Sequence, residues 1–398
     1  MKKTVLCILA LMIVISGQSI AEEITLKDAL QKTLSNNPEL ARFHWDTQAL
    51  ELQAISAGLR PNPELGLEVE NLGSSNNVET TVKVSQLIEF GSKRDKLVST
   101  AQHQQLINIC EQQIVTTELL TETKKTFTNV LAARKQLELA DELCKVAEKV
   151  LAEVIRRVEA GSTSIAEKHR AKVDYETTLI DRQKAQQKLR GAKTELSAKW
   201  NGTDSEFTVV GNLEELPGQP SLIIDNNPLL DKYSAQQEYR RAVVSMEKAL
   251  SKPDITASTG AKRFHDTNET AFMVELEFPL QLFNKNRENS QAAEAMVRSS
   301  EKSLHSITIE LQTKLELLQQ ELVATASEIA ALRDNVLPEA EKAFECSQKA
   351  WQRGAIPFTD VLYTERSLFQ LKNRYNDALV NYHYIVIDIK HITGRVQS

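Results

Sequence analysis

The stretch that decides the fold is ELGLEVENLGSSNNVETTVKVSQLI, residues 64–88. It contains two runs in which apolar residues alternate with charged or small ones, separated by the turn-forming sequence GSSNN. Alternation with a period of two is typical of β-strands, and such a turn between two runs indicates a hairpin. The alternating apolar positions are Leu65, Leu67, Val69, Val82 and Val84. A β-hairpin with one apolar face is therefore predicted over residues 64–90.

A second hairpin of the same kind is expected half a chain later, over residues 254–280. In its second run, four apolar residues point one way while Glu275 and Glu277 point the other. The four apolar residues are Phe272, Val274, Leu276 and Phe278. Each half of the chain thus supplies one hairpin, and with it two strands.

Other landmarks recur in the same order in both halves. Two such pairs are Asn36-Asn37-Pro38 with Asn226-Asn227-Pro228, and Gly161 with Gly354. Recurrence at a fixed offset is the signature of internal repeats. The chain is predicted to consist of two repeats, 22–200 and 225–398, joined by a Gly- and Pro-rich linker at 201–224.

Long helices are expected on both sides of each hairpin. The first helix is predicted over residues 26–59, because the prolines that follow cannot continue it. Residues 92–160 contain neither proline nor glycine, so they predict about 100 Å of continuous helix. The matching helix of the second repeat has a near-heptad apolar seam that Pro338 interrupts, which predicts a kink near Leu337.

The N-terminus predicts export. Lys2 and Lys3 precede an apolar run, and small residues then stand before Glu22, so residues 1–21 are expected to be a cleaved signal peptide. Cys7 lies inside the apolar run rather than after the cleavage site, so lipid modification is not expected. The remaining cysteines, Cys110, Cys144 and Cys346, are odd in number and far apart, which does not indicate a disulfide framework.

Composition excludes other classes. The formal net charge is −6 and no basic stripe carries interleaved aromatics, so a nucleic-acid surface is not expected. There is no phosphate loop, GxSxG or CxxC motif, and the histidines lack metal-ligand spacing. No catalytic, cofactor or metal site is predicted.

Two interpretations of the strands remain open. The apolar face meets lipid and the charged face a watery lumen, or the strands form a small sheet that caps a periplasmic helical bundle. Strands of roughly eight to eleven residues can cross an outer membrane when tilted. Four strands cannot close a barrel, and an open edge in hydrocarbon leaves backbone groups unpaired. A chain that inserts must therefore oligomerise, and three copies would supply twelve strands.

Four segments carry a resemblance to a known family. They are RPNPELGLEVEN (60–71), ETTVKVSQLIEFGSKR (79–94), EFPLQLFNKNR (277–287) and RGAIPFTDVL (353–362). With them, the chain resembles the TolC family of outer-membrane factors, and within it the CzcC-like branch of heavy-metal efflux. The resemblance implies a mainly α fold with a small β part. It also implies a homotrimer with a 12-stranded β-barrel in the outer membrane, continued by a long α-helical barrel in the periplasm.

The resemblance further implies partners and a role. The channel would conduct passively from an inner-membrane RND pump and a periplasmic adaptor to the exterior, with divalent heavy-metal cations as the favoured cargo. An exit duct for drugs or a type I secreted protein is an alternative. A soluble periplasmic coiled-coil scaffold is an alternative of a different class. The sequence leaves the cargo, the adaptor and the resting state of the channel open.

The two sharp reversals are where the resemblance implies the periplasmic gate. Gly161 and Gly354 are expected because such a turn needs a positive φ. The resemblance implies an acidic ring at Glu167 and Asp360 that favours cations. The alternative is that both carboxylates simply meet the helix dipole. The family has a further acidic position three residues after the one matched by Asp360. Tyr363 occupies that position here, so the carboxylate for a second acidic ring is missing.

The residues that follow the two turning glycines are expected to start the next helices. Ser162, Thr163 and Ser164 are predicted to supply the N-cap in the first repeat. Pro357 is predicted to stand in the first helical turn in the second.

Overall fold

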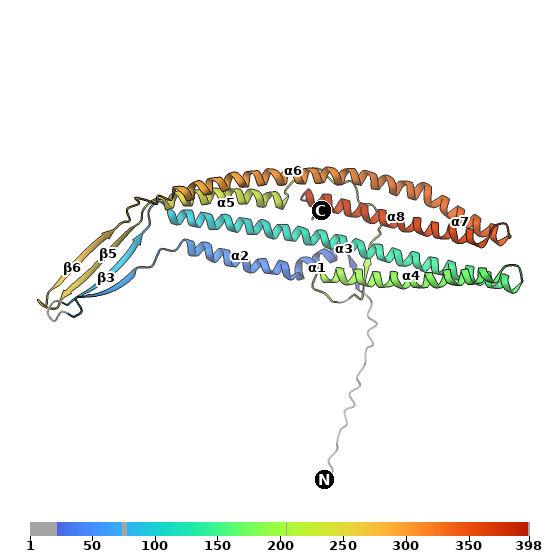
Figure 1. Ribbon diagram of the computed structural model, residues 1–398, viewed down its shortest axis with the longest axis horizontal. Coiled ribbons are helices and arrows are strands. Elements are labelled where there is room, and N and C mark those ends of the chain that lie inside the picture. Colours follow the sequence, from blue (N-terminus) through green and yellow to red (C-terminus); the bar gives the residue numbers. More distant parts are fainter. Residues whose placement is uncertain (1–21, 74–77, 204, 397–398) are drawn as a thin grey trace, which may run out of the picture.

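The computed structural model describes residues 22–73, 78–203 and 205–396, so the predicted signal peptide and part of the first hairpin turn lie outside the described residues. The molecule is elongated (Figure 1): a sheet lies at one end, two helical turns lie at the other, and the helices run lengthwise between them. The expected order of helix, hairpin, long helix, turn and helix occurs twice.

The first repeat contains β1 (Glu22–Thr25), α1 (Leu26–Asn36), α2 (Pro38–Ala57), β2 (Glu64–Glu70), β3 (Glu79–Ile88), α3 (Lys93–Glu159) and α4 (Ile165–Ala198). The rest contains β4 (Phe207–Val210), α5 (Pro228–Leu250), β5 (Ile255–Phe264), β6 (Thr270–Glu277), α6 (Arg287–Ala331), α7 (Leu337–Gln352) and α8 (Phe358–Ile392). A π-helical turn, Leu332–Val336, joins α6 to α7 directly before Pro338. The helix is therefore irregular where the proline predicts a kink, because Pro338 offers no N–H to the preceding turn.

The prediction of one helix over residues 26–59 is wrong, because the helix is interrupted at Asn37. This residue is extended (ψ 122°), its Oδ1 accepts the Glu39 N–H, and Pro38 occupies the first turn of α2. Asn227 does the same for α5, with Pro228 in the first turn. In both repeats the asparagine side chain also donates to a carbonyl at the end of the repeat's last helix, Lys199 O at 2.9 Å and Ile392 O at 2.7 Å. The repeated Asn-Asn-Pro is thus a helix start tied to a helix end.

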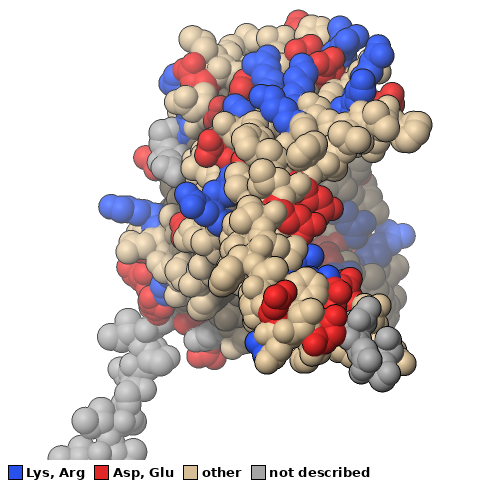
Figure 2. All heavy atoms as spheres, turned by 90° about the vertical axis from the view of Figure 1, so that its left-hand side faces the viewer, with Lys and Arg blue, Asp and Glu red and all other residues tan. Residues whose placement is uncertain are grey.

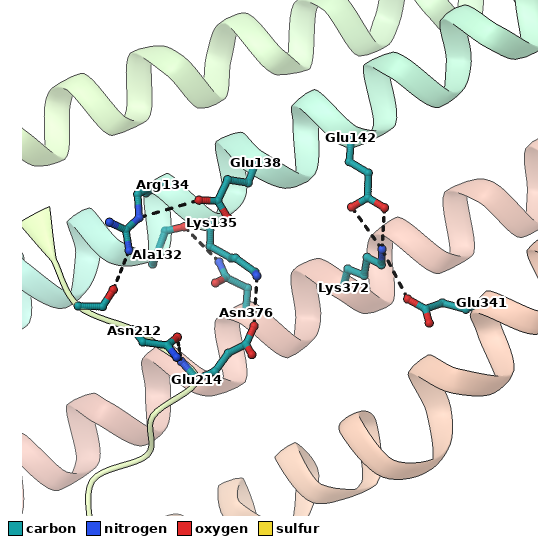
Figure 3. Close-up of polar contacts among 11 residues, drawn as sticks. Ala132, Arg134, Lys135, Glu138, Glu142, Asn212, Glu214, Glu341, Lys372 and Asn376 are labelled. Atoms are coloured by element: carbon teal, nitrogen blue, oxygen red, sulfur yellow. Dashed lines mark hydrogen bonds and ion pairs between the residues drawn. The ribbon is translucent and has the colours of Figure 1, made fainter. Parts of the chain in front are cut away.

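The segment predicted as a linker is held firmly against the helices. Within it β4 pairs in parallel with β1, and Phe207 and Val209 are buried. Arg134 of α3 donates to the carbonyls of Val209 and Gly211, both at 2.7 Å. Figure 3 shows how neighbouring contacts continue across the bundle, where Lys372 of α8 reaches Glu142 of α3 and Glu341 of α7. The middle of the molecule is therefore fixed by contacts from both repeats.

The four hairpin strands form one antiparallel sheet in the order β2-β3-β5-β6. β3 of the first repeat pairs with β5 of the second, so that Val84 lies opposite Thr259. β2 and β6 are left as edges. An unpaired edge exposes a row of N–H and C=O groups, so the sheet is open on both sides in the single chain.

Two clusters of buried apolar residues hold the helices together. The larger lies in the middle of the molecule, where α3, α6 and α8 pack with β1 and β4. The smaller lies near the helical turns and consists of Val150, Val154, Ala171, Trp351, Phe358 and Val361. In the part of the chain that the structure describes, no helix is both long and apolar enough to cross a membrane.

Candidate functional site

One face of the four-stranded sheet is apolar and exposed. The register brings Leu67, Val82, Ala261 and Phe272 into one row and Leu65, Val84, Thr259 and Val274 into the next. Phe272 is 89% exposed and Val274 is 81% exposed. Three of the four apolar residues predicted for the second hairpin, Phe272, Val274 and Leu276, thus share this face, and Phe278 follows the end of β6 and is exposed as well. Their contact with lipid stays a prediction.

The opposite face is polar and strongly acidic. Within the bounds of β2, β3, β5 and β6 it carries six glutamates and two lysines, a formal charge of −4. The glutamates are Glu64, Glu68, Glu70, Glu79, Glu275 and Glu277. Figure 2, which looks onto the strand end of the molecule, shows acidic side chains gathered in its lower half and basic ones concentrated at the top.

The two lysines of this face are tied to glutamates. Lys262 contacts both Glu70 and Glu79, and Lys83 lies 3.6 Å from Glu275. Lys83 has room because its neighbours across the sheet are glycines: a Cβ at Gly260 would come within 2.9 Å of the Lys83 Cβ. Both lysines are therefore paired with glutamates of the same face, and the net charge of the face remains negative.

The helical turns at the other end follow one design. Gly161 (φ 70°) and Gly354 (φ 74°) both have the predicted positive φ. In each turn the next residue's N–H reaches back five residues, from Ser162 to Arg157 O and from Ala355 to Ala350 O, both at 2.9 Å. This is the hydrogen-bond pattern of a helix that ends on a left-handed glycine. The two turns are therefore equivalent in structure as well as in sequence.

The residues after the glycines depart in detail from the prediction. Ser164 stands at the N-cap of α4, but its side chain makes no capping hydrogen bond; the Thr163 hydroxyl instead donates to the Glu167 carboxylate. Pro357 stands at the N-cap position of α8 rather than in its first turn. The Thr163 hydroxyl is thus bound to a side chain at the start of α4 rather than to a backbone N–H of that helix.

The residues predicted for the gate follow the two helical turns. Glu167 and Asp360 stand in the first turns of α4 and α8, and Asp360 and Tyr363 are exposed. A carboxylate in the first turn also meets the helix dipole favourably. An acidic ring made from these residues needs further copies of the chain, and it stays a prediction.

The contacts that join the two turns were not predicted from the sequence. Arg157 of α3 donates to Trp351 O at 3.1 Å and to Gln352 O, at the C-terminal end of α7, and its guanidinium lies 4.5 Å from the Trp351 ring centre. Arg366 of α8 donates to Asp174 of α4 at 2.7 Å. Sequence spacing did not predict a partner for Arg157. Its partners are almost two hundred residues away, and no local signal points to them.

A buried carboxyl group was missed as well. Glu365 of α8 is 1% exposed, and neither of its oxygens has a hydrogen-bond partner within the described chain. A sequence signal did exist, because Phe358, Val361, Glu365 and Leu368 follow helical three-and-four spacing. Among the described residues, no three His, Cys, Asp or Glu side chains come together as a metal site.

Comparison with known proteins agrees with this geometry. The chain is 27% identical to the cobalt-zinc-cadmium resistance protein CzcC of Cupriavidus metallidurans, over 96% of this chain and 93% of that protein. It is 21% identical to the nickel-cobalt-cadmium resistance protein NccC of Alcaligenes xylosoxydans xylosoxydans, over 74% of this chain and 70% of that protein.

Its fold is that of solved outer-membrane channels. The crystallised channel CusC superposes with a TM-score of 0.75 at 20% identity, over 92% of this chain and 91% of that one. The sequence profile described as "Outer membrane efflux protein" matches residues 29–202 and 219–395, one segment in each repeat. The chain therefore belongs to the outer membrane efflux protein family.

Proposed function

We propose that three copies of this chain form the outer-membrane channel of a tripartite efflux system, and that the channel passively conducts divalent metal cations to the exterior. The sheet supports the trimer. Its two edge strands are unpaired, and pairing of β6 of one copy with β2 of the next satisfies their backbone groups. Its apolar face is exposed, and lipid around the closed ring would cover that face. Twelve strands in a closed ring leave no edge and put the polar face inside.

The acidic face of the sheet is the observation that supports metal cations as the cargo. In a closed ring this face lines a water-filled lumen, and lipid outside the wall has a low dielectric constant. Fixed negative charge then raises the local concentration of cations and lowers that of anions. The relatives CzcC and NccC are named for resistance to cobalt, zinc, cadmium and nickel, which are cations of this class.

The proposed channel binds the cations that it conducts with low affinity. A conduit must release what it attracts, so it needs many weak contacts rather than one tight site. The glutamates are spread over successive rows of the sheet: Glu64 and Glu275 lie at the ends of one row, and Glu68 lies two rows away. Such spacing provides a field without enclosing an ion.

The remaining parts of the proposal concern the partner proteins and the cellular localisation. A periplasmic adaptor and an inner-membrane RND pump deliver the cargo to the helical end, and the channel itself catalyses nothing. Residues 1–21 direct export and are removed, and the mature N-terminus carries no lipid. The order of basic residues, apolar run and small residues in the first 21 positions supports export by a signal peptide.

The test compares two variants of the same sheet face. We expect Glu68→Gln to lower the preference for cations over anions, measured as the reversal potential of the purified channel in planar bilayers under a salt gradient. Lys83→Gln removes a positive charge from a neighbouring row and is expected to shift the reversal potential in the opposite direction. Equal reversal potentials for both variants and the wild type would contradict cation selection by this face.

A cellular experiment tests the cargo. Cells that lack the gene are expected to become sensitive to cobalt, zinc or cadmium salts and to regain resistance with the wild-type gene. Unchanged metal sensitivity, together with new sensitivity to drugs, would replace metal cations by drugs as the cargo.

A further inference from the structure

A buried carboxyl group with no hydrogen-bond partner among the described residues lies beside the apolar cluster near the two helical turns. Glu365 stands one turn along α8 from Val361, which belongs to the apolar cluster near the turns, and it is 1% exposed. Asp174 stands three residues along α4 from Ala171, in the same cluster, and is also buried. The two carboxyl groups therefore lie just beyond the cluster that joins the hairpin α3–α4 to the hairpin α7–α8.

Only one of the two carboxyl groups has its charge balanced by a direct bond. Asp174 accepts a hydrogen bond from Arg366 at 2.7 Å, whereas neither oxygen of Glu365 has a partner within the described residues. Burying an ionised carboxylate without a partner is very unfavourable, so such a group keeps its proton instead. Burial raises the pKa of the Glu365 carboxyl to about 8; the negative charge of Asp174 adds to the rise and Arg366 opposes it.

Among the described residues, Asp174 and Arg366 are the charged groups that shift the pKa of Glu365. α3 contributes the buried residues Cys144, Ala147 and Val150, and α7 contributes Trp351. Arg157 is occupied by Glu153 and by the carbonyl groups at the end of α7. The groups that act on Glu365 are therefore Asp174, which repels its ionised form, and Arg366, which is already bonded to Asp174.

We propose that Glu365 is a proton-controlled lock of the helical end. With its proton, the side chain is neutral and α8 packs against α3 and α4. When the proton leaves to the solvent, a second negative charge appears beside Asp174 in an apolar setting, and α8 moves away from α3 and α4. This inference rests on the proposed function: if the helical end is the entrance of the trimeric channel, separation of the two hairpins widens that entrance.

The sign of the pH dependence follows from the raised pKa. In separated hairpins the carboxyl group meets water and titrates in its ordinary acidic range, so the separated form releases the proton at lower pH than the packed form. The packed form therefore loses stability as pH rises, and the loss is complete above about pH 8. Below that pH, each unit of pH changes the ratio of packed to separated forms by at most about tenfold.

The first measurement tests the proton itself. Infrared difference spectra of the full-length purified protein are expected to show the carbonyl band of a protonated carboxylic acid at about pH 6 and its loss at about pH 9. Glu365→Gln should abolish this change. Asp377→Asn, which removes an exposed carboxylate from the same helix, should leave it intact. A wild-type spectrum without the band, or a band that survives in Glu365→Gln, would overturn the proposal.

The second measurement tests the lock. The open probability of single wild-type channels in planar bilayers is expected to rise between about pH 6 and about pH 9, and Glu365→Gln channels should stay mostly closed at both pH values. Asp377→Asn should behave like the wild type. Equal pH dependence in Glu365→Gln and the wild type would refute the lock. If the protein forms no channel at all, the proposed function fails, while the infrared result still decides whether Glu365 holds a proton.

Discussion

The ion pair of Lys93 and Asp254 lies at the junction between the sheet and the helices. Lys93 opens α3 and Asp254 immediately precedes β5, so their contact joins the two repeats. The Lys93 Nζ lies 2.7 Å from the Asp254 Oδ1, and the side chains are 8% and 23% exposed. The same oxygen accepts the Phe90 N–H at 3.0 Å. A lysine in the first turn of a helix faces an unfavourable dipole, so this one needs its partner.

The two single substitutions differ in what they leave behind. Asp254→Asn strands a buried ammonium group at a helix N-terminus, and breaking such a pair costs about 3–5 kcal/mol. Lys93→Met strands a carboxylate that is better hydrated and keeps its bond from Phe90, so we expect about 2 kcal/mol. The double variant leaves no unpaired charge and should be more stable than Asp254→Asn alone, which requires a coupling energy of about 3 kcal/mol, larger than the cost of Lys93→Met.

The assay is a double-mutant cycle. The free energy of unfolding is measured by urea titration of the purified protein in detergent micelles, followed by tryptophan fluorescence and circular dichroism. Additive effects, with the double variant less stable than either single one, would refute the idea that the pair holds the junction.

Three further predictions concern the sheet and the helical end. Gly260→Val places a Cβ about 2.4 Å from Val82 O, so it should break the pairing of β3 with β5 and prevent heat-modifiable trimers on gels, whereas Gly218→Val, in open space, should not. Phe272→Lys should reduce insertion into the outer membrane, at a cost of about 2–4 kcal/mol if the residue faces mid-bilayer lipid, while Met273→Lys on the polar face should insert normally; equal insertion would reject the assignment of faces. Replacing Glu167 by Gln and Asp360 by Asn should lower cation selectivity in planar bilayers, and unchanged reversal potentials would leave these carboxylates as helix-start residues only.

Local patterns predicted the strands and the turns because their causes are local. Alternation around Leu65 and Val82 depends only on which face of a strand meets water, and the structure has strands at both positions. Gly161 was predictable because a reversal at a helix end needs a positive φ. The break at Asn37 was also local: an asparagine followed by proline is a helix start, but the surrounding helix-forming residues hid it.

The rest could not be read from the sequence, because its causes lie far along the chain. The pairing of β3 with β5 joins residues separated by more than half of the first repeat's length, and only the packing of both repeats sets its register. Arg157 binds carbonyl groups at the end of α7, almost two hundred residues further along the chain. β4 was missed because its partner β1 lies at the other end of the first repeat.

Cation selection by the acidic sheet face and opening controlled by Glu365 are expected to be independent of one another, because the two sites lie far apart and salt screens the charges between them. The acidic sheet face and the Glu365 carboxyl lie at opposite ends of α3, whose 67 residues span about 100 Å. At physiological ionic strength the field of a charge in water falls off over about 8 Å. The glutamates of the sheet therefore cannot shift the titration of Glu365. Glu68→Gln should change the reversal potential and leave the pH dependence of opening intact, and Glu365→Gln should do the reverse.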